Sequence, residues 1–308
     1  MEKNELDKLP FNFRLVFLKF ILSAEDLTLT PYSGFTLRGG FGYIFKRISC
    51  VAKDKTCDNC ILNEKCVYSY IFESPAPGEK RYPYVPHPFI IEPPIGNTLD
   101  FNLVLIGKAI EYLPYFIYTF EELGAKGIGK ERKKFSLNLV SDCSGKVIYK
   151  GEQKVLYKGV QEIIANDIKA RRNVNAIQID FITPTRIKYN GKLTKEITFE
   201  IIIRNLLRRI SLLALYHCDE KWDIDFSQLI KRAKEIAILD SNLRWHEQER
   251  YSTRQKAQMK LGGFVGTAEF KGDLAQFMPY LKLGEYIHIG KATTFGLGKY
   301  KIEIKSFI

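Results

Sequence analysis

Three glycines near the C-terminus lie in a short basic loop whose residue types suit the binding of a phosphate chain. Gly290, Gly296 and Gly298 are flanked by Lys291 and Lys299, between two strand-like runs. Glycine allows a backbone to approach a ligand closely, so we expect bare amides and lysines to contact phosphates here. The spacing lacks the order Gly-x-Gly-x-x-Gly of a dinucleotide-binding loop, and no helix follows. The alternative is a tight turn packed under a helix.

Four cysteines form a second group with chemistry of its own. Cys50, Cys57, Cys60 and Cys66 lie in a polar, loop-like segment, and the central pair has the Cys-x-x-Cys spacing. Four thiolates at loop distance can close a tetrahedral site, for which zinc is the first choice. An iron–sulfur cluster is the alternative, because spacing alone does not separate the two. Free thiols, or disulfides in a hyperthermophile, remain as further interpretations.

A histidine near several cations and a tyrosine offers acid–base chemistry. His246 lies in a basic stretch close to Arg250, Tyr251 and Arg254, although a single histidine is more often structural than catalytic. Imidazole titrates near neutral pH and can take or give the proton of a reacting hydroxyl. His288 precedes the glycine-rich loop on a strand-like run, and we expect it to reach nucleic acid.

The composition favours a polyanionic partner. The chain has 308 residues, 45% of them hydrophobic, and a net charge of +12 from 47 basic and 35 acidic residues. This length suits one large domain or two smaller ones with packed cores. The basic residues are scattered over loops and strands rather than along one amphipathic helix, which favours nucleic acid over a membrane surface. Without a long apolar run or an apolar N-terminal signal, we expect a cytoplasmic protein.

The two halves of the chain repeat each other, although compositional bias is the alternative explanation. Each half predicts the order strand, helix, strand, strand, helix, glycine loop, strand. Landmarks recur in the same order about 165 residues apart: the strand-like runs 13–20 and 175–182, the helical runs 44–49 and 206–211, Gly107 with Gly272, and Pro114 with Pro279.

This order predicts an α+β chain of two tandem ferredoxin-like, or RRM-like, βαββαβ domains. Each domain should hold an antiparallel sheet covered on one face by helices, with a glycine loop before the last strand. The polar basic link at 169–174 predicts domains 1–170 and 171–308. The first domain should carry the cysteine cluster as an insertion at about 50–66.

The glycine-rich loop, the run Trp245–Gln255 and the run Leu261–Gly266 together resemble a known family. They are similar to the CRISPR-associated endoribonucleases that process precursor CRISPR RNA, within the RAMP superfamily of RNA-binding proteins. The resemblance implies metal-independent cleavage of repeat RNA by the ribose 2′-hydroxyl, leaving 2′,3′-cyclic phosphate and 5′-hydroxyl ends. The mature guide RNA would stay bound, no catalytic cofactor would be needed, and subunits of a CRISPR effector complex are possible partners.

Two other classes of function remain open. One is a non-catalytic RAMP subunit that binds guide RNA inside an effector complex. The other is a metal-dependent or redox-sensing nucleic-acid protein in which the cysteine cluster is functional.

Candidate roles follow from the resemblance and from side-chain chemistry. We expect His246 to act as general base or acid, with Tyr251 and Arg254 positioning the nucleophile and offsetting phosphorane charge. Some family members place a histidine on the first helix, where this chain has Tyr43. The expected RNA-binding residues are Gly290, Lys291, Thr293, Gly296, Gly298, Lys299, Arg250, His288, Tyr43 and Lys46.

Overall fold

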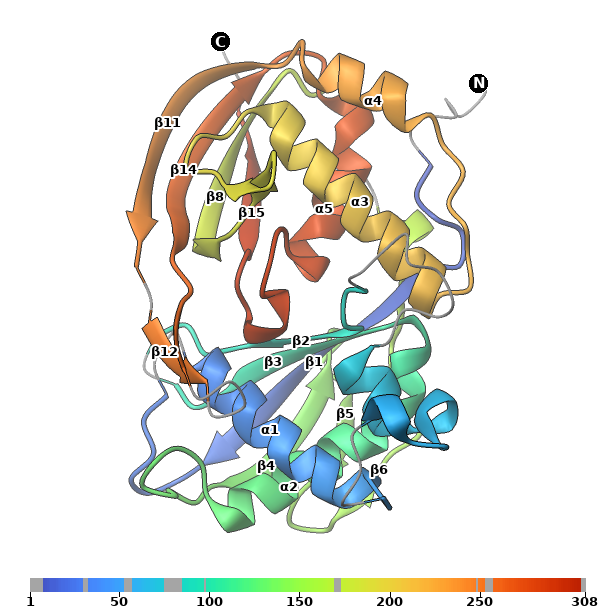
Figure 1. Ribbon diagram of the computed structural model, residues 1–308, viewed down its shortest axis with the longest axis vertical. Helices are drawn as coiled ribbons and strands as arrows, with labels where there is room; N and C mark the ends of the chain where they lie inside the picture. The colour runs from blue at the N-terminus through green and yellow to red at the C-terminus, as the bar shows by residue number, and fades with distance from the viewer. Residues whose placement is uncertain are drawn as a thin grey trace. The chain divides into compact units, whose positions relative to one another are not determined.

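The computed structural model describes most of the chain as two compact units (Figure 1). The N-terminal unit comprises residues 14–163 and 216–219, and the C-terminal unit comprises the rest. No helix in the described part of the chain is long and apolar enough to cross a membrane. The described residues are 8–29, 33–52, 57–74, 85–96, 98–168, 173–247, 249–252 and 257–305, with only the backbone described for 249–252 and 257–260.

The N-terminal unit is an antiparallel sheet with two long helices. Its strand order is β2–β3–β1–β4–β5–β6, so the first strand pairs with both the third and the fourth. This is the order of a ferredoxin-like domain, extended by a β-hairpin at one edge. The elements are β1 (Arg14–Ser23), α1 (Gly34–Ser49), β2 (Phe89–Glu92), β3 (Phe101–Ile106), α2 (Leu113–Lys126), β4 (Ser136–Asp142), β5 (Val147–Lys150), β6 (Val155–Leu156) and β7 (Ile163–Ile164).

Aromatic side chains form the centre of this unit. Phe20 of β1 faces the helices, as its place in the strand's alternation predicts, and stacks on Phe101 of β3 with ring centroids 4.9 Å apart. Helix α1 presents Phe41 and α2 presents Phe116, whose rings stack at 4.9 Å. The sheet and both helices therefore share one core, which fixes the position of the exposed face of α1.

The C-terminal unit repeats the same topology. Its four-stranded sheet has the order β11–β14–β8–β15, again second, third, first and fourth. Phe181 of β8 packs edge-on against Phe264 of β14 at 5.0 Å. The elements are β8 (Ala176–Thr185), β9 (Lys188–Tyr189), β10 (Lys192–Leu193), α3 (Phe199–His217), α4 (Phe226–Ala233), β11 (Ala237–His246), β12 (Glu249–Ser252), β13 (Ala257–Lys260), β14 (Gly263–Lys271), α5 (Met278–Ile287) and β15 (Tyr300–Ile304).

The tandem ferredoxin-like fold predicted from the repeated landmarks is confirmed. Pro114 and Pro279 each lie in the first turn of their helix, α2 and α5. Proline is tolerated there because its missing N–H has no partner in a helix start. Gly107 and Gly272, which precede these helices, both have positive φ. The landmarks therefore mark equivalent places in two copies of one domain plan.

The division of the chain differs in detail from the predicted ranges 1–170 and 171–308. Residues through Phe13 and from Ile164 onward belong to the C-terminal unit. The amide of Ala165 donates to the carbonyl of Phe13 (2.9 Å), and the Trp222 indole donates to the carbonyl of Lys8 (3.2 Å). These hydrogen bonds link the first residues of the chain to the C-terminal unit. A single boundary in the sequence therefore does not describe the two units. Residues 169–172 lie outside the described part.

Candidate functional site

The glycine-rich loop of the C-terminal unit is folded onto the end of β8. The amide of Gly298 donates to the carbonyl of Pro184 (3.2 Å), and the amide of Lys291 donates to that of Arg186 (2.9 Å). A β-carbon at Gly290 would lie 2.5 Å from the Arg186 carbonyl oxygen. The expectation of bare amides is therefore wrong at Gly298 and Lys291, whose N–H groups are used within the protein. Here the glycines serve close backbone packing.

Two predicted RNA contacts in this region are buried. His288 ends helix α5 with a φ of 59°, and its Nδ1 lies 3.0 Å from the carbonyl oxygen of Leu297. Its side chain is fully buried, so the prediction that it lies on a strand and reaches nucleic acid is wrong. The Thr293 side chain is also buried. The amides of Gly298 and Lys291 are not available to a phosphate; of the two loop lysines, the Lys291 side chain is exposed and the Lys299 side chain is half-buried.

Replacing Gly298 by alanine is expected to cost clearly more stability than replacing Gly129 in the equivalent turn of the N-terminal unit. Both have a φ of 76°. An alanine there loses about 1–2 kcal/mol from backbone conformation alone. At Gly298 the new β-carbon would also lie 1.9 Å from the Ile289 carbonyl oxygen, whereas nothing lies within 4 Å at Gly129. Equal losses in the free energy of unfolding, measured by denaturant titration, would contradict this packing.

Four cations from four segments form what we call the glycine-loop basic cluster: Arg186, Lys188, Arg208 and Lys291. Arg186 follows β8, Lys188 opens β9 and Arg208 lies on α3. Partial desolvation lowers the pKa of the Lys291 ammonium, although its side chain is largely exposed, and the charges of Lys188, Arg186 and Arg208 lower it further. Mutual repulsion of this kind is relieved when an anion binds. The cluster is therefore a candidate site for RNA phosphates.

The sequence reasoning identified only Lys291 of this cluster. Arg186 and Lys188 are alternate residues just after a strand, and alternate residues in an extended chain share a face. This alternate spacing is the sequence signal that could have indicated Arg186 and Lys188. Nothing in the local sequence indicates that Arg208, on a helix, joins them.

Arg186 connects the cluster to His246. Its Nη1 donates to the carbonyl of Gly262 (2.6 Å). Burial lowers the pKa of Arg186 and the charge of Glu247 acts against this, so Glu247 lies within electrostatic reach. Gly263, the residue after Gly262, lies on β14 and pairs with His246 on β11. The half-buried His246 therefore lies at the same end of the sheet as the basic cluster.

The other predicted residues of this region are described only in part. Arg250 and Tyr251 lie on β12, where they pair with Met259 and Gln258 of β13. The structure describes the backbone of these residues. Arg254 lies outside the described residues, so the roles predicted for these three side chains stay predictions.

Helix α1 of the N-terminal unit carries a second group of cations around the exposed Tyr43. Arg47 donates a hydrogen bond to the Tyr43 hydroxyl (3.2 Å). This bond and the charge of Arg47 lower the pKa of Tyr43, with smaller contributions from Arg132 and Lys126. Lys46, the other residue predicted here, places its ammonium 5.5 Å from the centre of the Tyr68 ring.

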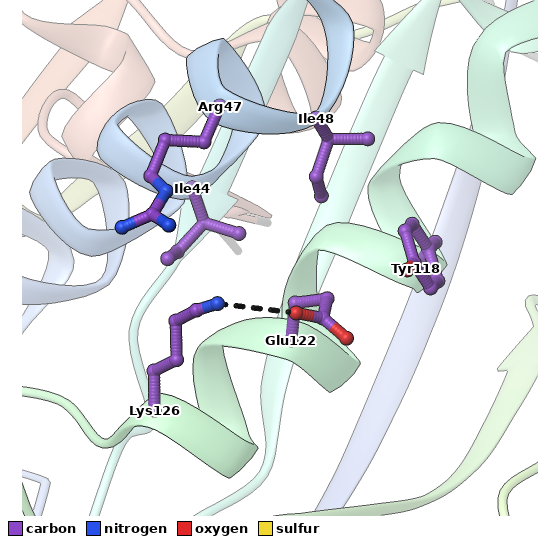
Figure 2. A pocket seen from close by; sticks show the side chains of 6 residues that line it. All are labelled: Ile44, Arg47, Ile48, Tyr118, Glu122 and Lys126. Carbon is purple, nitrogen blue, oxygen red and sulfur yellow. Dashed lines mark hydrogen bonds and ion pairs between the residues drawn. The ribbon is translucent and has the colours of Figure 1, made fainter.

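Arg47 also lines an open pocket of about 300 Å³ between α1 and α2 (Figure 2). Opposite it, Lys126 donates to the Glu122 carboxylate (3.4 Å). A carboxylate in the lining makes this pocket a poorer phosphate site than the glycine-loop basic cluster. The lining residues are Ile44, Arg47, Ile48, Tyr118, Glu122 and Lys126.

The Tyr43 phenol is expected to titrate below the pH of an ordinary tyrosine and to return toward it in an Arg47→Met variant. Arg47 stabilises the phenolate by a hydrogen bond and by charge. Because folding lowers this pKa, the contribution to stability is present above the unfolded value of about 10 and is lost as the pH falls. The difference in ultraviolet absorbance between the protein and its Tyr43→Phe variant, measured across a range of pH, reports the ionisation of Tyr43. An identical titration in the Arg47→Met background would contradict the assignment.

The four clustered cysteines lie in the N-terminal unit as free thiols, each half-buried. As their side chains stand, no set of three or more histidine, cysteine or acidic residues in the described ranges is arranged to coordinate an ion. The predicted zinc or iron–sulfur site remains a proposal, argued below.

Comparison with known proteins places the two units in context. Residues 179–300 match the family model of the CRISPR-associated endoribonuclease Cas6, and residues 13–163 match a model described as an N-terminal domain. An uncharacterized protein of Archaeoglobus fulgidus is 25% identical over 305 residues, covering 96% of this chain and 99% of that protein.

Solved structures with the same fold include members of that family. Thermus thermophilus Cas6 aligns with a TM-score of 0.56 and 16% identity, over 94% of this chain and 99% of its own. A Cas6 product complex gives a TM-score of 0.57 at 16% identity over the same shares. A partial Cas6-RT-Cas1–Cas2 complex gives 0.58 at 15% identity, over 96% of this chain and 47% of the matched chain. At these identities the likeness establishes the fold.

Proposed function

We propose that this chain, which belongs to the CRISPR-associated endoribonuclease family that processes precursor CRISPR RNA, cuts repeat RNA and keeps the product bound. The observation that carries the proposal is the glycine-loop basic cluster, at the same end of the sheet as His246. Three cations from separate segments act on Lys291, and an RNA phosphate would relieve the repulsion among the four charges.

The proposed reaction is a transesterification within the RNA. The 2′-oxygen forms a bond to the neighbouring phosphorus as the bond from phosphorus to the 5′-oxygen breaks. A general base takes the 2′-hydroxyl proton, and a general acid returns a proton to the leaving 5′-oxygen. His246 serves as one of these groups, and nearby cations offset the charge on the phosphorane. Tyr251 and Arg254 keep their predicted positioning roles in this proposal.

No metal ion takes part in this proposed scheme, because the nucleophile comes from the RNA itself. The products are a 2′,3′-cyclic phosphate and a 5′-hydroxyl. The same basic cluster would hold the product after the cut, since its phosphate contacts do not depend on the broken bond.

One observation favours the alternative of a non-catalytic RNA-binding subunit. In the described part of the C-terminal unit, His288 is buried, which leaves His246 as the histidine with solvent access. The first helix carries Tyr43 where some relatives carry a histidine. A chain that had lost its catalytic base could keep the basic cluster and bind guide RNA only.

Cleavage by purified protein in excess chelator separates the two functions. A repeat RNA labelled at either end is incubated with the full chain, and the product ends are mapped chemically. Cyclic phosphate and 5′-hydroxyl ends support the proposal. Tight binding without cleavage would favour the non-catalytic subunit, and cleavage that stops in chelator would contradict the metal-independent step.

A further inference from the structure

The described part of the cysteine segment in the N-terminal unit buries little apolar surface. Its two 3₁₀ turns, Cys57–Asn59 and Asn63–Lys65, contain no buried residue. Val51 and Ile61 are 78% and 92% exposed. A segment that buries so little apolar surface needs another source of stability to hold one conformation, and cross-links or metal ions usually supply it.

The backbone of this segment brings its thiols into one neighbourhood. Cys60 donates its amide to the carbonyl of Cys57 (3.1 Å), which closes the Cys-x-x-Cys turn. Cys50 ends helix α1, and Cys66 follows the second turn, where its carbonyl accepts from the amide of Tyr70 (2.9 Å). Cys57 and Cys66 both pack against the same hydrophobic core.

Each cysteine side chain has one χ1 torsion with three staggered rotamers. A change of rotamer can therefore re-aim a thiol without moving the backbone of the segment.

We infer that Cys50, Cys57, Cys60 and Cys66 hold one metal centre through four thiolates, with a structural role. Either a zinc ion or an iron–sulfur cluster suits such a ligand set. On binding, each thiol releases its proton to solvent, and the metal neutralises the thiolate charges that would otherwise repel. No open coordination position remains for chemistry on RNA.

The centre would stabilise helix α1 through the helix that follows the segment. In that π-helical turn (Ser69–Glu73), Phe72 packs so closely on α1 that a β-carbon at Gly42 would lie 2.1 Å from its ring. Phe72 also contacts Phe41, the central aromatic residue of α1, with ring centroids 6.3 Å apart. Loss of the metal should therefore loosen the packing beneath the exposed Tyr43.

Metal analysis of the full-length protein, purified anaerobically, tests this inference. We expect either about one zinc per chain or iron with acid-labile sulfide, and titration with a mercurial should release the metal as four thiols react. Cobalt substitution of a zinc form should give the absorption bands of a tetrathiolate site. Protein that carries no metal and has disulfides or freely reactive thiols at these positions would overturn the inference.

Paired variants keep the test informative if the cysteine mutants fold poorly. A Cys57→Ser/Cys60→Ser variant should lose the metal and melt at a lower temperature, with new protease cleavage in the segment 50–66. Cys143→Ser removes an exposed cysteine of the same unit and should leave the metal content and Tm unchanged. Full metal content in the double variant would refute the ligand set. These readouts do not involve RNA cleavage, so the inference and the proposed function can fail separately.

Discussion

A His246→Ala variant is expected to cut repeat RNA about 10²–10⁴-fold more slowly than the unchanged protein in single-turnover reactions. His246 lies at the sheet end where Arg186 donates to the carbonyl of Gly262, and its imidazole can accept a proton from the ribose hydroxyl. Without it, the 2′-hydroxyl proton would have to pass to water or to a poorly matched side chain.

The reaction is run at saturating protein, so that RNA binding does not limit the rate. Asn242→Ala, at an exposed position on the same strand β11, is the matched control and should leave the rate unchanged. A His246→Ala rate within about threefold of the unchanged protein is too small a loss for a general base. That result would move the search to the Tyr43 and Arg47 group on α1.

Replacing Lys188, Arg208 and Lys291 together by glutamine is expected to weaken RNA affinity on the order of 10- to 100-fold at moderate salt. The affinity should also depend less on salt, because each lost phosphate contact removes counterion release. On single strands, three lost contacts lower the logarithmic salt slope by about 2. Arg186 is left in place because its guanidinium also holds the carbonyl of Gly262.

A control with the same change in net charge distinguishes local contacts from general electrostatics. Lys231, Lys234 and Lys301 lie on the exposed surface of α4, its C-terminal end and β15 in the same unit. Their replacement by glutamine should change affinity much less. Equal losses in the two triple variants would show that the basic cluster is not a specific phosphate site.

Much of the fold was predictable because the same order of helices and strands occurs twice in the chain. Within a helix, proline fits only the first turn, so Pro114 and Pro279 each mark the start of a helix. Their constant separation, shared with Gly107 and Gly272, then aligned the two halves. The positions of such prolines and glycines can be interpreted from the sequence because they depend on the backbone conformation of a single residue.

The candidate site was less predictable because its parts meet through tertiary structure. Gly298 was recognised as part of a glycine-rich loop, but its hydrogen-bond partner, Pro184, lies on a strand more than a hundred residues earlier. His288 was assigned to a strand from the run that leads into the loop. The helical spacing of Leu281, Gly284 and Ile287 instead continues α5 up to that histidine, which then turns inward.

The cations around Lys291 show the same limit. Arg208 belongs to a helix and Arg186 to the end of a strand, and only the packing of α3 on the sheet brings them together. A single sequence without aligned relatives carries no signal for that convergence.

Cleavage of a repeat RNA with a single 2′-deoxynucleotide on the 5′ side of the cut tests the central claim most directly. The experiment compares this RNA with the unmodified one in excess chelator, at saturating protein. The account predicts that the unmodified RNA is cut to cyclic phosphate and 5′-hydroxyl ends. The deoxy RNA should bind with equal affinity and stay intact, because it lacks the nucleophile. Cleavage of the deoxy RNA at the normal rate, or products with 5′-phosphate ends, would contradict the account.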